Sequence, residues 1–272
     1  TKAIPYVNKP ENVTPGLATW YASTYYDGNS YASILVKTRE GRPILIKGNK
    51  DYGITHGNTN PQIVASVLSL YDSERLKNPT IDGQKANYLE VDTKIRSGLE
   101  SAKKIVFVSN TIISPYILEA ISTLKDSLPN SQIEHIQYDA VSYLGIRNAN
   151  KASFLNDNSN SNIGFIPSYD FSKAKTIVSI GADFLNSWLM PTQFSGQYGA
   201  RRDPDGEWMS KHFQFESVMS ITGSNADVRG MIKPSEQKAV LIYMLNAFGV
   251  KLDLPIKLNK DIEDKIKEAI AS

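Results

Sequence analysis

The sequence predicts an α/β protein made of two three-layer αβα Rossmann-like units with an N-terminal β-hairpin region. Short apolar runs at residues 104–109 and 175–180 have the pattern of buried parallel strands, and helical periodicity follows each of them. A polar, low-complexity stretch at residues 156–162 separates the two patterns. Upstream, strand patterns at residues 31–37 and 44–46 flank a turn, which predicts a hairpin.

Length and composition exclude several classes of protein. The 272 residues, 41% of them hydrophobic, suffice for one large domain or two modest ones. The formal charge is +2, so there is no strong basic field and we expect no nucleic-acid partner. No apolar run reaches the roughly 18–20 residues of a membrane span, so we expect no direct membrane insertion.

Cysteine and histidine usage argues against a metal centre in this chain. The sequence has no cysteine, which excludes a thiol nucleophile and any cysteine-held zinc or iron–sulfur site within it. The three histidines, His56, His135 and His212, do not have metal-ligand spacing. We therefore expect no metal ligands, and we assign these histidines to structural hydrogen bonds.

The first part of the chain is predicted to contain an N-terminal region, residues 1–87, and an incomplete first α/β unit, residues 88–155. In the unit, Ser114 is predicted to cap a helix whose first turn holds Pro115. That helix connects two strands and makes a βαβ unit. The elements expected in this part are a helix at 62–71, a helix at 91–102, a buried strand at 104–109, a helix to 128 and a strand at 133–138.

The second α/β unit is predicted to span residues 163–250, after a surface loop at 156–162. A strand at 175–180 is followed by a helix at 184–198, interrupted by Pro191, and then by a solvated charged loop that holds Arg201 and Arg202. The remaining elements expected are a strand at 212–217, a turn at 223–227, a helix through 248 and, within residues 251–272, an amphipathic C-terminal helix at 259–271 with no obvious partner.

The turn at Gly181, Ala182 and Asp183 is the best functional candidate. In open parallel sheets, ligands bind where the carboxyl ends of strands meet the amino ends of helices. A glycine there lets the backbone approach a phosphate, and free N–H groups at a helix start favour an anion. The turn lacks the GxGxxG pattern, so a tight turn without a ligand is the alternative.

Glu216 and Ser217 end the next predicted strand. An acidic residue at this place can accept a hydrogen bond from a ribose hydroxyl or a base edge. The alternative is a solvated carboxylate at a strand end. No serine lies in a G-x-S-x-G motif, so we expect no catalytic residue in this chain. A dinucleotide-type site would comprise Gly181, Asp183, Glu216 and Ser217.

Several segments in order resemble the molybdopterin oxidoreductases of the bis-guanine-dinucleotide class. These are the hairpin at residues 33–49, the segments at 71–79 and 90–99, the Gly181 turn, and the segments at 223–227 and 232–235. Three stretches, 14–24, 212–217 and 220–229, more narrowly resemble the molybdopterin-oxidoreductase-like region of the large iron–sulfur subunit of bacterial alternative complex III.

Departures from the family pattern suggest loss of the cofactor. The position of the last N-terminal cluster cysteine reads Gly57 to Asn60, without a thiolate. The "PGT" that helps bind the pterin dinucleotide reads Pro234, Ser235 and Glu236, and a carboxylate there repels a pyrophosphate. Glu216 replaces the usual Asp.

The resemblance leaves three functions open. The first is a cofactor-free scaffold, a fragment of an iron–sulfur subunit in a quinol-oxidising electron-transfer complex. That parent holds its clusters elsewhere, contacts other subunits of a membrane-bound respiratory complex, and lies on the periplasmic side of a bacterial membrane. The second is the dinucleotide-cofactor-binding part of an active oxidoreductase, holding molybdopterin guanine dinucleotide. The third is an unrelated α/β module that binds a small nucleotide.

Overall fold

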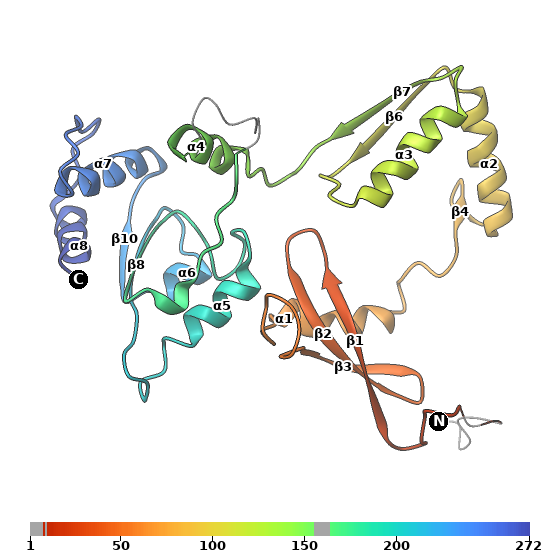
Figure 1. The fold of residues 1–272 in the computed structure, drawn as a ribbon, viewed down its shortest axis with the longest axis horizontal. Helices are drawn as coiled ribbons and strands as arrows, with labels where there is room; N and C mark the ends of the chain where they lie inside the picture. Colours follow the sequence, from red (N-terminus) through yellow and green to blue (C-terminus); the bar gives the residue numbers. More distant parts are fainter. Residues whose placement is uncertain (1–7, 9, 155–163) are drawn as a thin grey trace. The chain divides into compact units, whose positions relative to one another are not determined.

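The computed structural model describes residue 8, residues 10–154 and residues 164–272. Contacts group the chain into two compact units, one formed by the chain up to Ser73 together with Tyr169–Ser272, the other by Glu74–Ser168 (Figure 1). The surface loop predicted at residues 156–162 lies outside the described residues. The division into four parts made from the sequence stays a prediction.

The N-terminal segment forms a three-stranded antiparallel sheet in the order β1 (Ala18–Tyr26), β2 (Tyr31–Arg39), β3 (Arg42–Gly48). The predicted hairpin is confirmed as β2 and β3, whereas β1 was not predicted. The predicted helix at 62–71 is also confirmed, as α1 (Pro61–Ala65) continued by the 3-10 helix η1 (Ser66–Leu70). These helices bury one face of the sheet, in a small core of Ala32, Ile34, Ile46, Ile63 and Val67.

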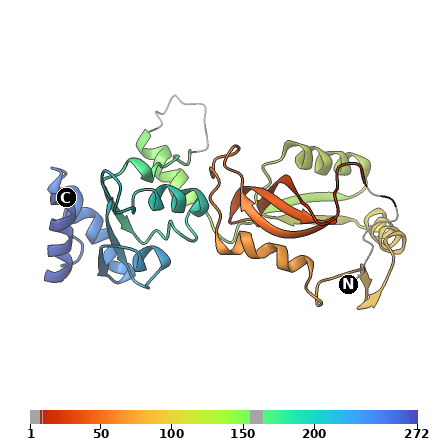
Figure 2. The same ribbon diagram turned by 90° about the horizontal axis from the view of Figure 1, so that it is seen from below.

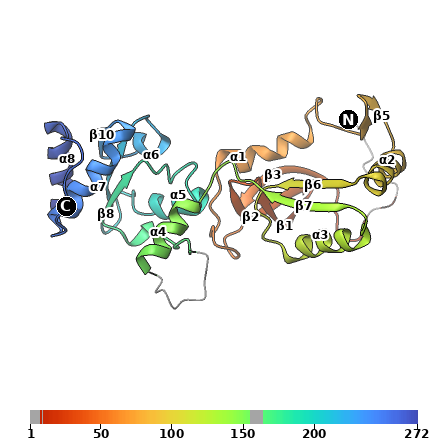
Figure 3. The ribbon, with the colours of Figure 1, turned by 90° about the horizontal axis from the view of Figure 1, so that it is seen from above.

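The second unit contains the predicted βαβ arrangement. Strands β6 (Lys104–Ser109) and β7 (Gln132–Gln137) are parallel, and α3 (Pro115–Ser127) connects them (Figure 3). Ser114 caps α3 and Pro115 opens it, as predicted. The remaining elements are β4 (Thr80–Ile81), β5 (Gln84–Lys85), α2 (Tyr88–Ser101) and α4 (Leu144–Phe154), the last not predicted.

The prediction that β6 is a buried strand is wrong. Only Ile105 of this strand is buried, and Val108 is 72% exposed. A parallel strand is buried when further strands and helices cover it on both sides. Among the described residues, β6 has only β7 beside it.

The C-terminal segment forms a three-stranded parallel sheet in the order β10 (Val228–Met231), β9 (Lys211–Glu216), β8 (Thr176–Ile180). The mixed α/β class is thereby confirmed, while sheets of three and two strands match the Rossmann-like detail only loosely. The helical elements here are η2 (Phe171–Lys173), α5 (Pro191–Gly199), α6 (Ile221–Ser224), η3 (Pro234–Glu236), α7 (Gln237–Ala247) and α8 (Lys260–Ala271).

The C-terminal helix α8 has a partner, contrary to the expectation from the sequence. Its residues Ile262 and Ile266 are buried in one core with Phe213 and Phe215 of the central strand β9. Val240 of α7 belongs to the same core, and Figure 2 shows α8 in dark blue beside α7. The apolar stripe of α8 therefore covers the sheet. None of the described helices is both long enough and apolar enough to cross a membrane.

Candidate functional site

The fold gathers the predicted site residues at one edge of the parallel sheet. Gly181 and Asp183 follow β8, Glu216 is the last residue of β9, and Ser217 comes next. Parallel strands end at the same edge, so these groups become neighbours. The N–H group of Gly181 donates to the carbonyl oxygen of Phe215 at 2.8 Å, which ties the turn to β9.

Gly181 makes the sharp turn that leaves β8. Its φ of +68° lies in the left-handed region, where a side chain is unfavourable. A Cβ atom at this position would lie 3.0 Å from Nε2 of Gln237, the first residue of α7. The side-chain amide of Gln237 thus occupies the space directly beside the turn, where a phosphate would have to approach.

The helix predicted from residue 184 does not form at the turn. The carbonyl oxygen of Asp183 instead accepts three backbone N–H groups, from Asn186 at 3.1 Å, Ser187 at 2.9 Å and Trp188 at 3.0 Å. Helix α5 begins only at Pro191, which has no N–H group. The anion-binding helix start expected beside Gly181 is therefore replaced by a closed turn.

The side chain of Asp183 is also fully engaged. Its Oδ1 accepts the backbone N–H of Thr222 at 3.1 Å and the hydroxyl of Thr222 at 2.7 Å. Its Oδ2 accepts Asn186 Nδ2 at 3.1 Å and the hydroxyl of Ser187 at 3.5 Å. Thr222 is completely buried. Asp183 therefore joins the turn after β8 to α6, which follows β9.

Glu216 is surrounded by donors in the same way. Oε1 accepts Arg229 Nε at 2.7 Å and the Ser220 N–H at 3.1 Å. Oε2 accepts the Ser220 hydroxyl at 2.6 Å and Gln214 Nε2 at 3.2 Å. A Cβ at position 223 would overlap the carboxylate of Glu216, so Gly223 is needed for α6 to pack here.

These donors stabilise the ionised form of Glu216. Burial, which leaves its side chain only 4% exposed, raises its pKa by disfavouring the charged form. The hydrogen bonds from Arg229, Ser220 and Gln214 act in the opposite direction and prevail, so the pKa of Glu216 lies below its ordinary value. The group is an ionised carboxylate in an internal network.

The two carboxylates do not fit a dinucleotide as they are arranged. An ionised carboxylate offers about four lone-pair positions. Asp183 and Glu216 each accept four hydrogen bonds from the protein itself. A ribose or a guanine edge would have to displace an internal donor at either one.

Ser217 differs from the other three predicted residues. Its hydroxyl oxygen is buried and has no hydrogen-bond partner among the described residues. It lines a pocket of about 610 Å³ whose wall includes Lys233, Lys257 and Glu236. The carboxylate of Glu236 accepts the backbone N–H of Lys233 at 2.8 Å, so this amide is already occupied.

Behind the edge, the sequence correctly assigned His212 to a structural hydrogen bond, whereas Gln214 beside it was missed. His212 and Gln214, both completely buried, alternate with Phe213 and Phe215 along β9. His212 Nδ1 lies 3.2 Å from the hydroxyl of Tyr198, and Gln214 donates to Glu216. Burial lowers the pKa of His212 to about 4. The alternation in the sequence was visible, but it is also typical of a strand with one solvated face.

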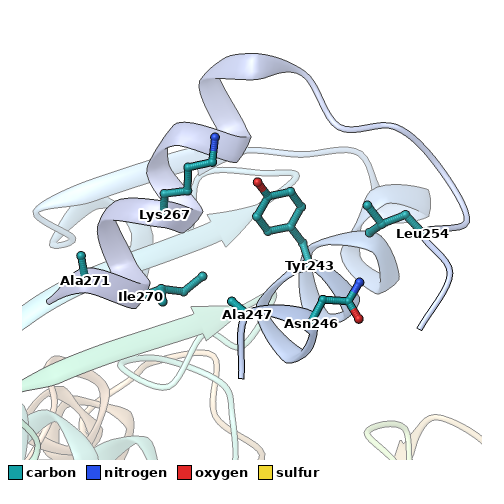
Figure 4. A pocket seen from close by; sticks show the side chains of 7 residues that line it. All are labelled: Tyr243, Asn246, Ala247, Leu254, Lys267, Ile270 and Ala271. Carbon is teal, nitrogen blue, oxygen red and sulfur yellow. The ribbon is translucent and has the colours of Figure 1, made fainter. Parts of the chain in front are cut away.

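A second pocket, of about 430 Å³, lies between α7 and α8 (Figure 4). Its wall is mostly apolar and contains the side chains of Tyr243, Leu254 and Ile270, with Lys267 at its margin. None of the site residues predicted from the sequence lines it. Within the described part of the chain, no three His, Asp or Glu side chains cluster as a metal site would require.

No family model matches the chain. The chain is similar to the menaquinone reductase, molybdopterin-binding-like subunit, of Nitratidesulfovibrio vulgaris Hildenborough, with 22% identity over 241 residues. This match supports a molybdopterin oxidoreductase-like relationship. It covers 82% of this chain and 32% of the relative, so the chain spans about a third of the protein it matches.

Proposed function

We propose that this chain is a cofactor-free scaffold within a larger molybdopterin-oxidoreductase-like iron–sulfur subunit of a respiratory complex. The hydrogen bonding of Asp183 and Glu216 is the observation on which the proposal rests. Each carboxylate accepts four internal hydrogen bonds, so the groups expected to hold a dinucleotide stabilise the fold instead. The similarity to the molybdopterin-binding-like subunit of a menaquinone reductase supports the respiratory context.

The more specific assignment, to the large iron–sulfur subunit of alternative complex III, rests on the sequence segments that resemble that subunit. In this proposal the parent subunit lies on the periplasmic side of a bacterial membrane, contacts other subunits of the complex, and passes electrons through clusters outside this chain. The role of this chain is to keep the parent subunit in its folded shape and to provide surface that other subunits cover. No bond is made or broken by its residues.

One observation favours a second function, the binding of a nucleotide or dinucleotide. The unpartnered hydroxyl of Ser217 lies in the wall of a pocket that also contains Lys233 and Lys257. A pocket wall that contains a hydroxyl donor and two lysines suits a phosphate. This pocket belongs to the alternative in which the chain is the cofactor-binding part of an active oxidoreductase.

Metal and pterin analysis of the subunit purified from its native membrane separates the two functions. The scaffold proposal expects iron, without molybdenum, tungsten or pterin. Molybdenum or tungsten near one atom per subunit, together with pterin, would overturn it.

A titration of the 272-residue chain with GDP, followed by calorimetry, tests the pocket itself. The scaffold proposal expects no saturable heat. Binding that is lost in Ser217→Ala and Lys257→Ala, and retained in the control Lys251→Ala outside the pocket wall, would instead establish the second function.

A further inference from the structure

The outer edge of β1 has the features of a sheet edge that pairs with another strand. Among the described residues β1 pairs with β2 alone, which leaves its other backbone edge open (Figure 1). Its nine residues, Ala-Thr-Trp-Tyr-Ala-Ser-Thr-Tyr-Tyr, include no charge, no proline and no glycine. Seven of the nine are exposed. Such an edge is a template for pairing with another strand.

The opposite edge of the same sheet is protected against pairing. Strand β3 carries Arg42, Pro43 and Lys47, and its register with β2 shifts between Lys37 and Thr38. Charge, proline and irregular register are the usual means by which proteins block an edge strand. Because β3 has all three and β1 has none, the two edges differ in the way expected when only one of them is an interface.

We propose that β1 pairs antiparallel with β1 of a second copy of this chain, around a two-fold axis at Ala22. Ala22 is the middle residue of Ala18–Tyr26, so this register pairs the strand over its whole length. It places Trp20 opposite Thr24 and Thr19 opposite Tyr25. Pairs of an aromatic with a β-branched side chain are favourable across strands. The product joins two three-stranded sheets into one.

The lack of charge on β1 selects a second copy as the occupant. In this register Ala22 faces its own copy at the two-fold axis, where a charged residue would repel itself, and every other residue of β1 faces a second uncharged residue. The exposed Trp20 is held by its own sheet, with Lys37 Nζ at 5.6 Å and Lys47 Nζ at 5.8 Å from its ring centre. These lysines cover the ring and leave the backbone edge of β1 free.

Cysteine cross-linking tests the register, because the chain has no cysteine of its own. In Ala22→Cys the two thiols would be on Cα atoms about 5 Å apart, within the range of a disulfide. In the control Ala18→Cys they would be separated by about 27 Å. We expect mild oxidation at micromolar concentration to give at least about tenfold more disulfide dimer for Ala22→Cys. Equal yields would overturn the proposed register.

Analytical ultracentrifugation of the 272-residue chain tests the interface. We expect a reversible dimer, and we expect Ala22→Lys to raise its dissociation constant at least about tenfold through repulsion at the axis. The matched control Ile44→Lys adds the same charge on the protected edge and should leave the dimer unchanged. A monomer up to about 100 μM, or equal effects of both lysines, would overturn the proposal and assign the edge to another strand.

Discussion

Arg229 Nε donates a 2.7 Å hydrogen bond to Oε1 of Glu216, thirteen residues earlier in the chain. The glutamate side chain is 4% exposed and that of the arginine 25%. Arg229 lies on β10 and Glu216 at the end of β9, so the pair holds together the edge at which a ligand site was predicted. The pair explains why a carboxylate can remain ionised there.

Removing the arginine should be costly. In Arg229→Met the buried Glu216 loses its charged partner, and we expect a loss of about 3 kcal/mol in the free energy of unfolding. Urea denaturation measures it. The control Lys94→Met removes an exposed pair with Asp82 and should cost under about 1 kcal/mol. Adding Glu216→Gln to Arg229→Met should recover part of the loss, and strict additivity would contradict the pairing.

His212 should make stability depend on pH. Its pKa is about 4 when folded, chiefly because burial disfavours the charged form, and its ordinary value is 6.5. Between these values the unfolded chain binds a proton that the folded chain does not. Stability should therefore fall as the pH drops from about 6.5 to about 4, by up to about 3 kcal/mol.

Denaturation midpoints measured across this window, for the wild type and for His212→Gln, test that prediction. The variant should show a weaker slope above pH 5. Glu216 and Asp227, whose pKa values are lowered, lose their stabilising charge further down in pH and are present in both proteins. Identical slopes in the two proteins would show that His212 is not the group that titrates.

A side chain at position 181 should destabilise the turn. Gly181→Ala places Cβ at a φ of +68° and within 3.0 Å of the Gln237 amide, so we expect a loss of about 1–2 kcal/mol. Gly199→Ala, at the end of α5, has no atom within 4 Å of the new Cβ and should be nearly neutral. Thermal unfolding of both variants makes the comparison, and equal shifts would contradict the strained turn.

The C-terminal helix should be essential to the core of the parallel sheet. Ile266 is completely buried, and Ile266→Ala should cost about 3 kcal/mol by leaving a cavity beside β9. Leu241→Ala on α7, where the side chain is 49% exposed, is the control and should cost under about 1 kcal/mol. A loss no larger than that of the control would mean that α8 does not cover the sheet in solution.

Several elements were predictable because neighbouring residues determine them. The strand pattern at 31–37 predicts β2, and the apolar runs predict β6 and β8. Ser114 followed by Pro115 predicts the start of α3, since a cap and a first-turn proline act within one turn of helix. In each case the deciding atoms lie within a few residues of one another.

Other elements depend on residues far along the chain. Strand β10 has four residues and is ordered by pairing with β9, so its own sequence carries little signal. The loop holding Arg202 was expected to be solvated. Residues 203–207 of that loop are exposed, as expected, but Arg202 itself is half-buried and makes two 2.8 Å hydrogen bonds to Asp227, 25 residues away. Strand β9, which α8 covers, also lies far from α8 in the sequence, so local pattern did not predict this contact.

The sequence by itself determined the mixed α/β class, the hairpin, the βαβ unit and the position of four candidate residues at strand ends. Only the tertiary structure decided what those residues do. Hydrogen-bond capacity is limited, and donors from Thr222, Ser220 and Arg229 reach Asp183 and Glu216 only after β8, β9 and β10 align. The sequence therefore identifies the two carboxylates, whereas only folding brings the hydrogen-bond donors to them.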